Sequence, residues 1–116
     1  RSSQESEPEV RPDPAKRFSA KLYVLIDRGC GSACEITLQL LEALPGRVLV
    51  GENSRGAVEY GDRGRLLLPH SRVHVALATA AVRYRDGRAV EGRGYAPDLR
   101  VAKGGDALAA ALAEIR

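Results

Sequence analysis

The sequence is poor in residues that mark several large classes of protein. Its 116 residues include no tryptophan, no methionine and one phenylalanine. The net charge is +3, and the basic residues are scattered among acidic ones. They form none of the clusters with interleaved aromatic side chains that are typical of a nucleic-acid-binding surface. No apolar run approaches the roughly 18 residues of a membrane-spanning helix. We therefore expect no nucleic-acid partner and no membrane span within this sequence.

Cysteine and histidine are scarce, with two residues of each. Cys30 and Cys34 flank an expected helix start, and in a regular helix their Cβ atoms would lie about 5–6 Å apart, too far for a disulfide. Because Cys30 belongs to the preceding turn, the spacing does not exclude a bridge, but we expect two small buried thiols. Two cysteines without neighbouring histidines make a poor metal site, so we expect neither metal nor cofactor.

The chain begins with arginine and lacks methionine, which indicates a piece of a longer protein. Residues 1–17 are rich in serine, glutamate, proline and arginine and show no apolar periodicity. They cannot bury enough surface to offset the entropy of ordering, so we expect a linker or flexible segment there. Residues 18–116 would then form at most one ordinary domain, with 44% hydrophobic residues in the whole sequence to build a core.

The clearest structural pattern is a strand, a helix and a second strand. A strand is expected at 21–27, where residues 22–26 form a continuous apolar run typical of a strand covered on both faces. Residues 33–44 have a helical period, with the polar side chains confined to one narrow stripe that begins at Glu35. We therefore expect the rest of this helix to be buried. An apolar strand at 47–50 would complete a right-handed βαβ unit with parallel strands, and hence an α/β fold.

Short extended segments and turns are expected after residue 51. Alternation of Val73, Val75 and Leu77 with other side chains predicts one better-buried strand face, and Asp86-Gly87 is a hairpin signal. The remaining expected elements are extended segments at 58–60, 65–68, 73–82 and 99–101, turns at 61–64 and 69–71, and a helix at 106–115.

Ser32 stands at the expected start of the first helix. A hydroxyl there faces unpaired backbone N–H groups and the positive end of the helix dipole. Such a site can stabilise an oxyanion, which suits a nucleophilic serine. However, Ser32 and Glu35 also spell a capping box, in which both side chains merely satisfy backbone donors. The local sequence leaves both interpretations open.

A dinucleotide site is a further alternative. Gly29-Cys30-Gly31 lies between a strand and a helix, and Glu52 follows at the end of the next strand, close to the fingerprint that binds a ribose. The third glycine is missing, because Cys34 occupies its place. The hairpin-like strands that follow also do not continue the βαβ series. We regard this interpretation as the weakest.

Four segments, in order and at fitting separations, resemble the C-terminal-processing (tail-specific) and tricorn-core serine peptidases. Residues 27–36 resemble the nucleophile segment, in which a strand leads into a Ser-Ala-x-Glu helix start. Residues 51–56 resemble the Gly-Glu-x-Thr/Ser-x-Gly loop, and Leu68-Pro69 matches a later Leu-Pro element. Residues 91–98 match the Glu-Gly-x-Gly-Val-x-Pro-Asp ending, with tyrosine in place of valine. Together they cover nearly all of the chain from residue 21.

The resemblance implies a fold like that of ClpP and crotonase, built from ββα units, with residues 18–116 as the C-terminal part of the catalytic domain. Ser32 would be the nucleophile that forms an acyl-enzyme with a peptide or protein substrate. The N–H of Ala33 would be one oxyanion donor, with the second supplied upstream in the same polypeptide. Glu35 would keep a structural role at the cap. Export or the cell envelope is the expected location, and an oligomer is compatible with the fold.

One departure from the family concerns the general base. Ala57 stands where the tail-specific branch has its lysine, and alanine cannot accept a proton. The tricorn-like branch uses an upstream histidine and a late glutamate, whose position Glu91 matches as a candidate orienting acid; a surface glutamate in a glycine-rich turn is the alternative. His70 and His74 match no catalytic element. We therefore expect the general base to lie outside this chain and the isolated chain to be inactive as a peptidase. Alternatively, the protein is a non-catalytic member of the same fold that binds peptides or another ligand.

Overall fold

The centre of the molecule is a parallel strand–helix–strand unit. The computed structural model describes residues 20–115, and the linker predicted at 1–17 lies outside them. The unit consists of β1 (Leu22–Ile26), α1 (Ala33–Leu41) and β2 (Arg47–Gly51). The two strands pair in parallel, from Leu22 opposite Arg47 to Ile26 opposite Gly51. The predicted βαβ unit is therefore confirmed.

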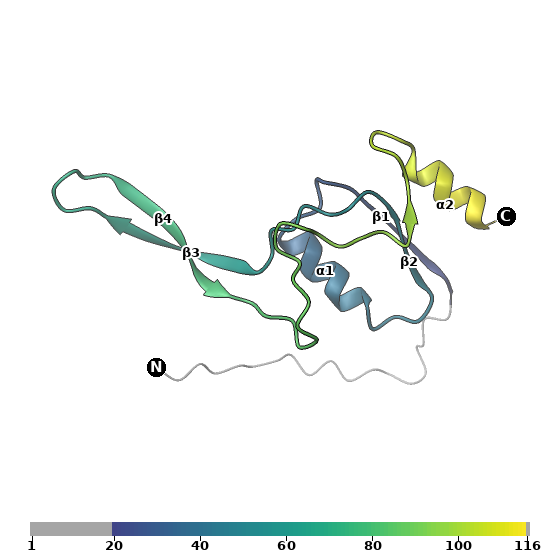
Figure 1. Ribbon diagram of the computed structural model, residues 1–116, viewed down its shortest axis with the longest axis horizontal. Coiled ribbons are helices and arrows are strands. Elements are labelled where there is room, and N and C mark those ends of the chain that lie inside the picture. The colour runs from purple at the N-terminus through teal and green to yellow at the C-terminus, as the bar shows by residue number, and fades with distance from the viewer. Residues whose placement is uncertain (1–19, 116) are drawn as a thin grey trace.

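A third strand and a second helix complete an α/β layer structure. The strand β5 (Leu99–Arg100) pairs in parallel with β2, which gives the order β1-β2-β5. The helix α2 (Ala107–Ile115) packs on β1 and β2, and Figure 1 shows the sheet between α1 and α2. On the α1 side, Leu38 joins a buried cluster with Ile26 and Leu49.

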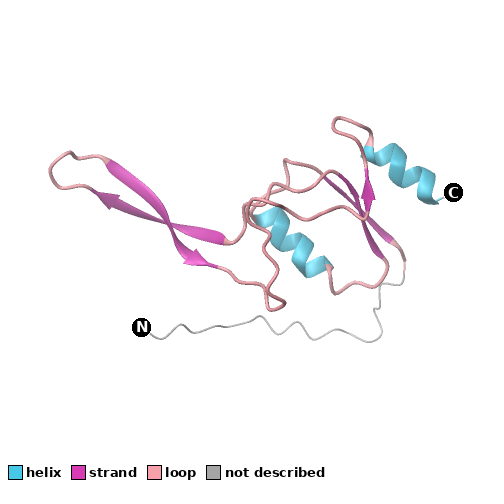
Figure 2. Ribbon diagram, viewed as in Figure 1, coloured by secondary structure: helices cyan, strands magenta, loops and turns pink. Residues whose placement is uncertain are grey.

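The remaining strands form a long arm. β3 (Tyr60–Leu67) and β4 (His74–Ala81) pair antiparallel and project away from the sheet (Figures 1 and 2). Val75 is half-buried, but the other large apolar side chains of the arm are exposed, namely Tyr60, Leu66, Leu67, Leu68, Val73, Leu77 and Val82. The better-buried face predicted for residues 73–82 is therefore wrong, because the other elements of residues 20–115 leave the arm uncovered.

The turns expected in and after the arm are confirmed only in part. The turn predicted at 61–64 is wrong, because β3 continues through it and Gly61 and Gly64 pair with Ala80 and Leu77. The turn predicted at 69–71 is confirmed, because the chain reverses within residues 68–73, where Leu68 N–H donates to Val73 O at 3.0 Å. Residues 84–87 form a turn, but no strands pair directly on either side of it, so the hairpin predicted there is wrong.

The burial predicted for α1 is only partly correct, since Leu38 is buried and Gln39 is exposed as expected, but other residues differ. Glu35 is 0% exposed, whereas Ile36 is 49% and Leu40 is 71% exposed. The helix also ends at Leu41, three residues before the predicted end. On β1, Leu25 is 45% exposed, so residues 20–115 do not cover both faces of this strand. The hydrogen bonds to Glu35 described below explain why its side chain is buried.

Replacing Gly51 with alanine should strongly destabilise the sheet. Gly51 has φ +130°, and a Cβ there would lie 2.1 Å from the Ile26 carbonyl oxygen on the paired strand. We expect Gly51→Ala to lose about 3 kcal/mol or more of unfolding free energy, measured by urea denaturation. The matched control is Gly87→Ala, which also has positive φ (+75°) but open space around it. It should lose only about 1 kcal/mol, and equal losses would contradict this account.

Candidate functional site

Ser32 occupies an unusual backbone conformation between β1 and α1. It directly precedes α1 and is exposed, with φ 53° and ψ −115°. Such a conformation costs a non-glycine residue about 1–3 kcal/mol, and a helix-capping serine normally lies in the β region. The capping-box pattern expected for Ser32 and Glu35 is present, and Glu35 accepts the backbone N–H of Ser32. A strained strand-to-helix turn of this kind exposes a serine hydroxyl as a nucleophile elbow does.

The loop that follows β2 supports this turn. Ser32 N–H donates to the Ala57 carbonyl at 3.0 Å, and Arg55 N–H donates to the Cys30 carbonyl at 2.7 Å. Ala33 is the first residue of α1, so its N–H has no acceptor inside the helix. The turn therefore presents a hydroxyl next to the N–H groups of a helix N-terminus.

A buried carboxylate joins the turn to this loop. Glu35 Oε1 accepts hydrogen bonds from Ser54 Oγ at 2.5 Å and Gly56 N–H at 2.6 Å. Its Oε2 accepts hydrogen bonds from Ala57 N–H at 2.9 Å and Ser32 N–H at 3.2 Å. The expected structural role of Glu35 at the start of the helix includes this last bond. The side chain also contacts the loop after β2, which the local capping pattern does not predict.

The hydrogen bonds determine the ionisation of Glu35. Burial raises the pKa of its carboxyl group, because it disfavours the charged form. The four hydrogen bonds lower the pKa by more, so the net pKa lies below its ordinary value of 4.5. Glu35 is therefore a carboxylate at neutral pH and an acceptor for all four donors.

Ser54 extends the network to the last of the family-like segments. Its Oγ accepts a hydrogen bond from Tyr95 N–H at 2.7 Å, and its N–H donates to the Tyr95 carbonyl at 3.0 Å. Gly94 permits this approach, since a Cβ there would lie 2.1 Å from the Ser54 carbonyl oxygen. Ser54 lies in one of the family-like segments, but its sequence context predicts no role for it. The structure thus brings residues 32–35, 54–57 and 94–95 together.

Glu91 lies close to this loop but contacts its backbone. Its Oε2 accepts hydrogen bonds from Val58 N–H and Glu59 N–H, both at 3.0 Å. In return, Glu59 Oε1 accepts hydrogen bonds from Val90 N–H at 2.5 Å and Glu91 N–H at 3.1 Å. These four hydrogen bonds hold residues 58–59, directly after Ala57, against residues 90–91, and we call them the clasp of Glu59 and Glu91.

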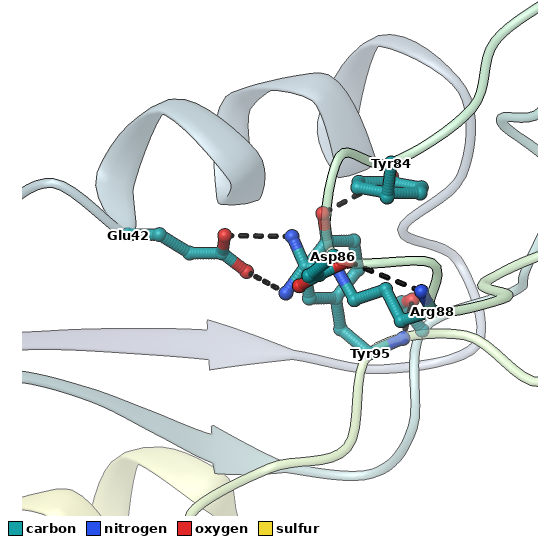
Figure 3. A network of polar contacts seen from close by, with 6 residues as sticks. Glu42, Tyr84, Asp86, Arg88 and Tyr95 are labelled. Atoms are coloured by element: carbon teal, nitrogen blue, oxygen red, sulfur yellow. Dashed lines mark hydrogen bonds and ion pairs between the residues drawn. The ribbon is translucent and has the colours of Figure 1, made fainter.

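A second polar cluster, for which the sequence contains no local signal, fixes the other end of α1 (Figure 3). Arg88 donates two hydrogen bonds of 2.7 Å to the carboxylate of Glu42, and this pairing raises the pKa of Arg88. Its guanidinium lies 4.5 Å from the ring centre of Tyr84 and 5.3 Å from that of Tyr95. Burial and the hydrogen bond with Tyr84 raise the pKa of Tyr95. Arginine here combines a bidentate ion pair with cation–π contacts.

The expectation of two free thiols is wrong. Cys30 and Cys34 form a disulfide with a Cα–Cα distance of 5.3 Å. Cys30 lies in the turn before α1, where the reversal of the chain at Ser32 brings it closer to Cys34 than helical geometry would. The sequence spacing alone could not show this, because the distance depends on the backbone of Ser32.

The other candidate groups lie elsewhere. His70 is in the turn between β3 and β4 and His74 is the first residue of β4, and both are exposed. Figure 1 shows that this turn lies at the end of the arm away from α1. Glu52 Oε1 accepts a hydrogen bond from Gly104 N–H at 3.1 Å. Within residues 20–115, no three histidine, cysteine, aspartate or glutamate side chains are placed to hold a metal ion.

Comparison with known proteins identifies related sequences and structures. The model of peptidase family S41 matches residues 1–101. A candidate peptidase from Parabacteroides merdae has a TM-score of 0.69 and 23% identity over 90% of this chain and 34% of its own. A photosystem II D1 C-terminal processing protease has a TM-score of 0.54 and 24% identity over 72% of this chain and 21% of its own.

A lipoprotein from Streptococcus agalactiae is also similar, with a TM-score of 0.57 and 18% identity over 84% of this chain and 32% of its own. At these identities the likeness to solved structures shows the fold. The chain spans about a fifth to a third of the length of these structures. The search of curated proteins found no match.

Replacing Glu35 with glutamine should weaken the fold and alter its response to acid. The amide loses one acceptor oxygen and places an NH₂ group against backbone donors, which should cost about 1–3 kcal/mol at pH 7. Because the folded-state pKa of Glu35 is lowered, its carboxylate contributes stability above pH 4.5 that is lost as pH falls through the folded-state pKa.

Urea denaturation between pH 7 and pH 3 should therefore show a smaller loss of stability in Glu35→Gln than in the unaltered protein. The control is Glu114→Gln, an exposed position on α2, which should follow the unaltered protein throughout. A Glu35→Gln curve parallel to that of the unaltered protein would contradict the assigned ionisation.

Proposed function

Because the chain belongs to peptidase family S41, we propose that it carries the nucleophile of a serine endopeptidase. The observation that carries this proposal is the backbone of Ser32, with φ 53° and ψ −115° at the start of α1. This backbone conformation is unfavourable for a residue that only caps a helix. The four hydrogen bonds to Glu35 do not involve the hydroxyl of Ser32, so they do not explain why the hydroxyl is presented in this way. The conformation is understandable if the hydroxyl must be presented to a substrate.

In the proposed reaction, Ser32 Oγ attacks a peptide carbonyl carbon and its proton passes to a general base. The tetrahedral oxyanion is stabilised by the N–H of Ala33 and by the positive end of α1. Collapse breaks the peptide C–N bond, the base protonates the leaving amine, and water then hydrolyses the acyl-enzyme. A second oxyanion donor comes from an upstream part of the same polypeptide.

The general base in this proposal also lies outside the described residues. Ala57 lies beside the nucleophile, since its carbonyl accepts the Ser32 N–H, and its methyl group has no basicity. His70 and His74 are on the arm. Glu91 acts as a positioning residue in this scheme, because its carboxylate holds the backbone at residues 58–59, next to Ala57.

The same proposal includes the architecture of the whole domain. Residues 18–116 are the C-terminal part of a catalytic domain with a ClpP/crotonase-like core of ββα units. The parallel β1-α1-β2 unit with the serine at its first turn supports this, and so does the small share of each related structure that the chain spans. Substrates are peptides or proteins.

We also propose export or the cell envelope as the location. Disulfides form and persist in oxidising compartments, and the Cys30–Cys34 bridge is therefore evidence for one. One structural relative is a lipoprotein. None of the helices in residues 20–115 is long and apolar enough to cross a membrane.

The second candidate function is a non-catalytic member of the fold that binds a peptide or another ligand. The observation that favours it is alanine at position 57, in the place of a lysine base. The Glu35 network would then serve only to hold the loops around a binding site. The reactivity of Ser32 separates the two candidates.

A fluorophosphonate probe should label the full-length protein, and Ser32→Ala should abolish the labelling. Only an activated serine reacts quickly with such a probe. Ser71→Ala, which removes an exposed hydroxyl on the turn of the arm, should label at the unaltered rate. The readout is mass-spectrometric identification of the modified serine. Absence of labelling in well-folded protein would favour the binding function.

The isolated 116-residue chain should not react with the probe, although it contains Ser32. A serine without a general base is a weak nucleophile, and we expect labelling to fall at least about 100-fold below that of the full-length protein. Rapid labelling of the isolated chain would place the base within it and overturn the proposed arrangement.

A further inference from the structure

The Cys30–Cys34 disulfide closes a covalent ring around the candidate nucleophile. The ring contains Gly31, Ser32 and Ala33, so both the attacking hydroxyl and the proposed oxyanion N–H lie between the two cysteines. No other covalent link in the described part of the chain bears on this turn. The reaction proposed above does not use the disulfide.

The position of the ring suits a local role. In the chain-entropy description, a disulfide that closes a short loop stabilises a fold less than one that closes a long loop. This bridge spans four residues in sequence, so its contribution to global stability is among the smallest available. Its effect is concentrated on the backbone it encloses, which includes the positive φ of Ser32.

The two cysteines have different environments. Cys30 is buried in the core cluster with Ile26, Leu38 and Tyr95, so one end of the ring is fixed to the centre of the fold. Cys34 is exposed on the first turn of α1. Both line an open pocket of about 640 Å³ at the carboxyl ends of β1 and β2. A small dithiol can therefore approach the bridge from solvent.

We propose that the Cys30–Cys34 disulfide is a positioning element that holds Ser32 and Ala33 in their reactive geometry. Reduction adds two electrons and two protons to the bridge and gives two thiols, while the dithiol becomes a disulfide. The turn then keeps the hydrogen bonds from Ser32 N–H to Ala57 and Glu35 but loses its covalent constraint. Ser32 reacts at its full rate only in the oxidised protein. This inference rests on the proposed nucleophilic role of Ser32.

The test is the kinetics of fluorophosphonate labelling in the full-length protein, oxidised or reduced with dithiothreitol. The rate constant at saturating probe should fall about tenfold or more on reduction, because small displacements of a reacting group are costly. The probe concentration for half-saturation should not change. Cys34→Ser, which removes an exposed residue, should have the same low rate under both conditions. Reoxidation should restore the labelling rate of the unaltered protein but not that of Cys34→Ser.

The matched control is Arg88→Gln, which breaks the ion pair at the opposite end of α1. It should label like the unaltered protein in both redox states. An equal loss of rate in Arg88→Gln would show general loosening of the helix and overturn the proposal, as would an unchanged rate on reduction. If the oxidised protein does not label at all, the proposed nucleophile fails as well, and this outcome is distinct from the others.

Discussion

The arrangement of this molecule depends on the hydrogen bonds that the carboxylate of Glu35 accepts. It receives donors from the turn before α1 and from the loop after β2, and Ser54 carries the connection on to Tyr95. Each donor is a buried or half-buried polar group that would be costly to leave unpaired. One charged side chain therefore fixes the relative positions of three segments that are far apart in the sequence. These hydrogen bonds also explain why α1 turns the charged side chain of Glu35 inward.

Much of the fold could be predicted from the sequence because its signals are local. The apolar runs of β1 and β2, the helical period between them and the glycine-bracketed turn gave the parallel unit correctly. The four family-like segments were also correct as markers of the family. These patterns record backbone requirements that neighbouring residues largely satisfy among themselves.

The errors have a common cause in contacts between distant residues. Amphipathicity assigned Glu35 to the solvent, because a helical wheel cannot include the N–H groups of Gly56 and Ala57. The spacing of Cys30 and Cys34 described a regular helix, whereas Ser32 reverses the chain between them. Gly61 and Gly64 looked like turn residues, yet pairing with β4 keeps them extended. In each case tertiary structure overrode a local preference.

The arm has a consequence for how this chain can vary. Its two strands leave the body between Ala57 and Glu91, and its base is closed by a hydrogen bond of 2.7 Å from Val82 N–H to the Glu59 carbonyl. The clasp of Glu59 and Glu91 lies on the body side of that closure. Changes of backbone within residues 61–81 therefore reach the segments around Ser32 only through this closure. The arm is thus joined to the chemistry at its base alone, although its turn carries the Leu68-Pro69 element of the family pattern.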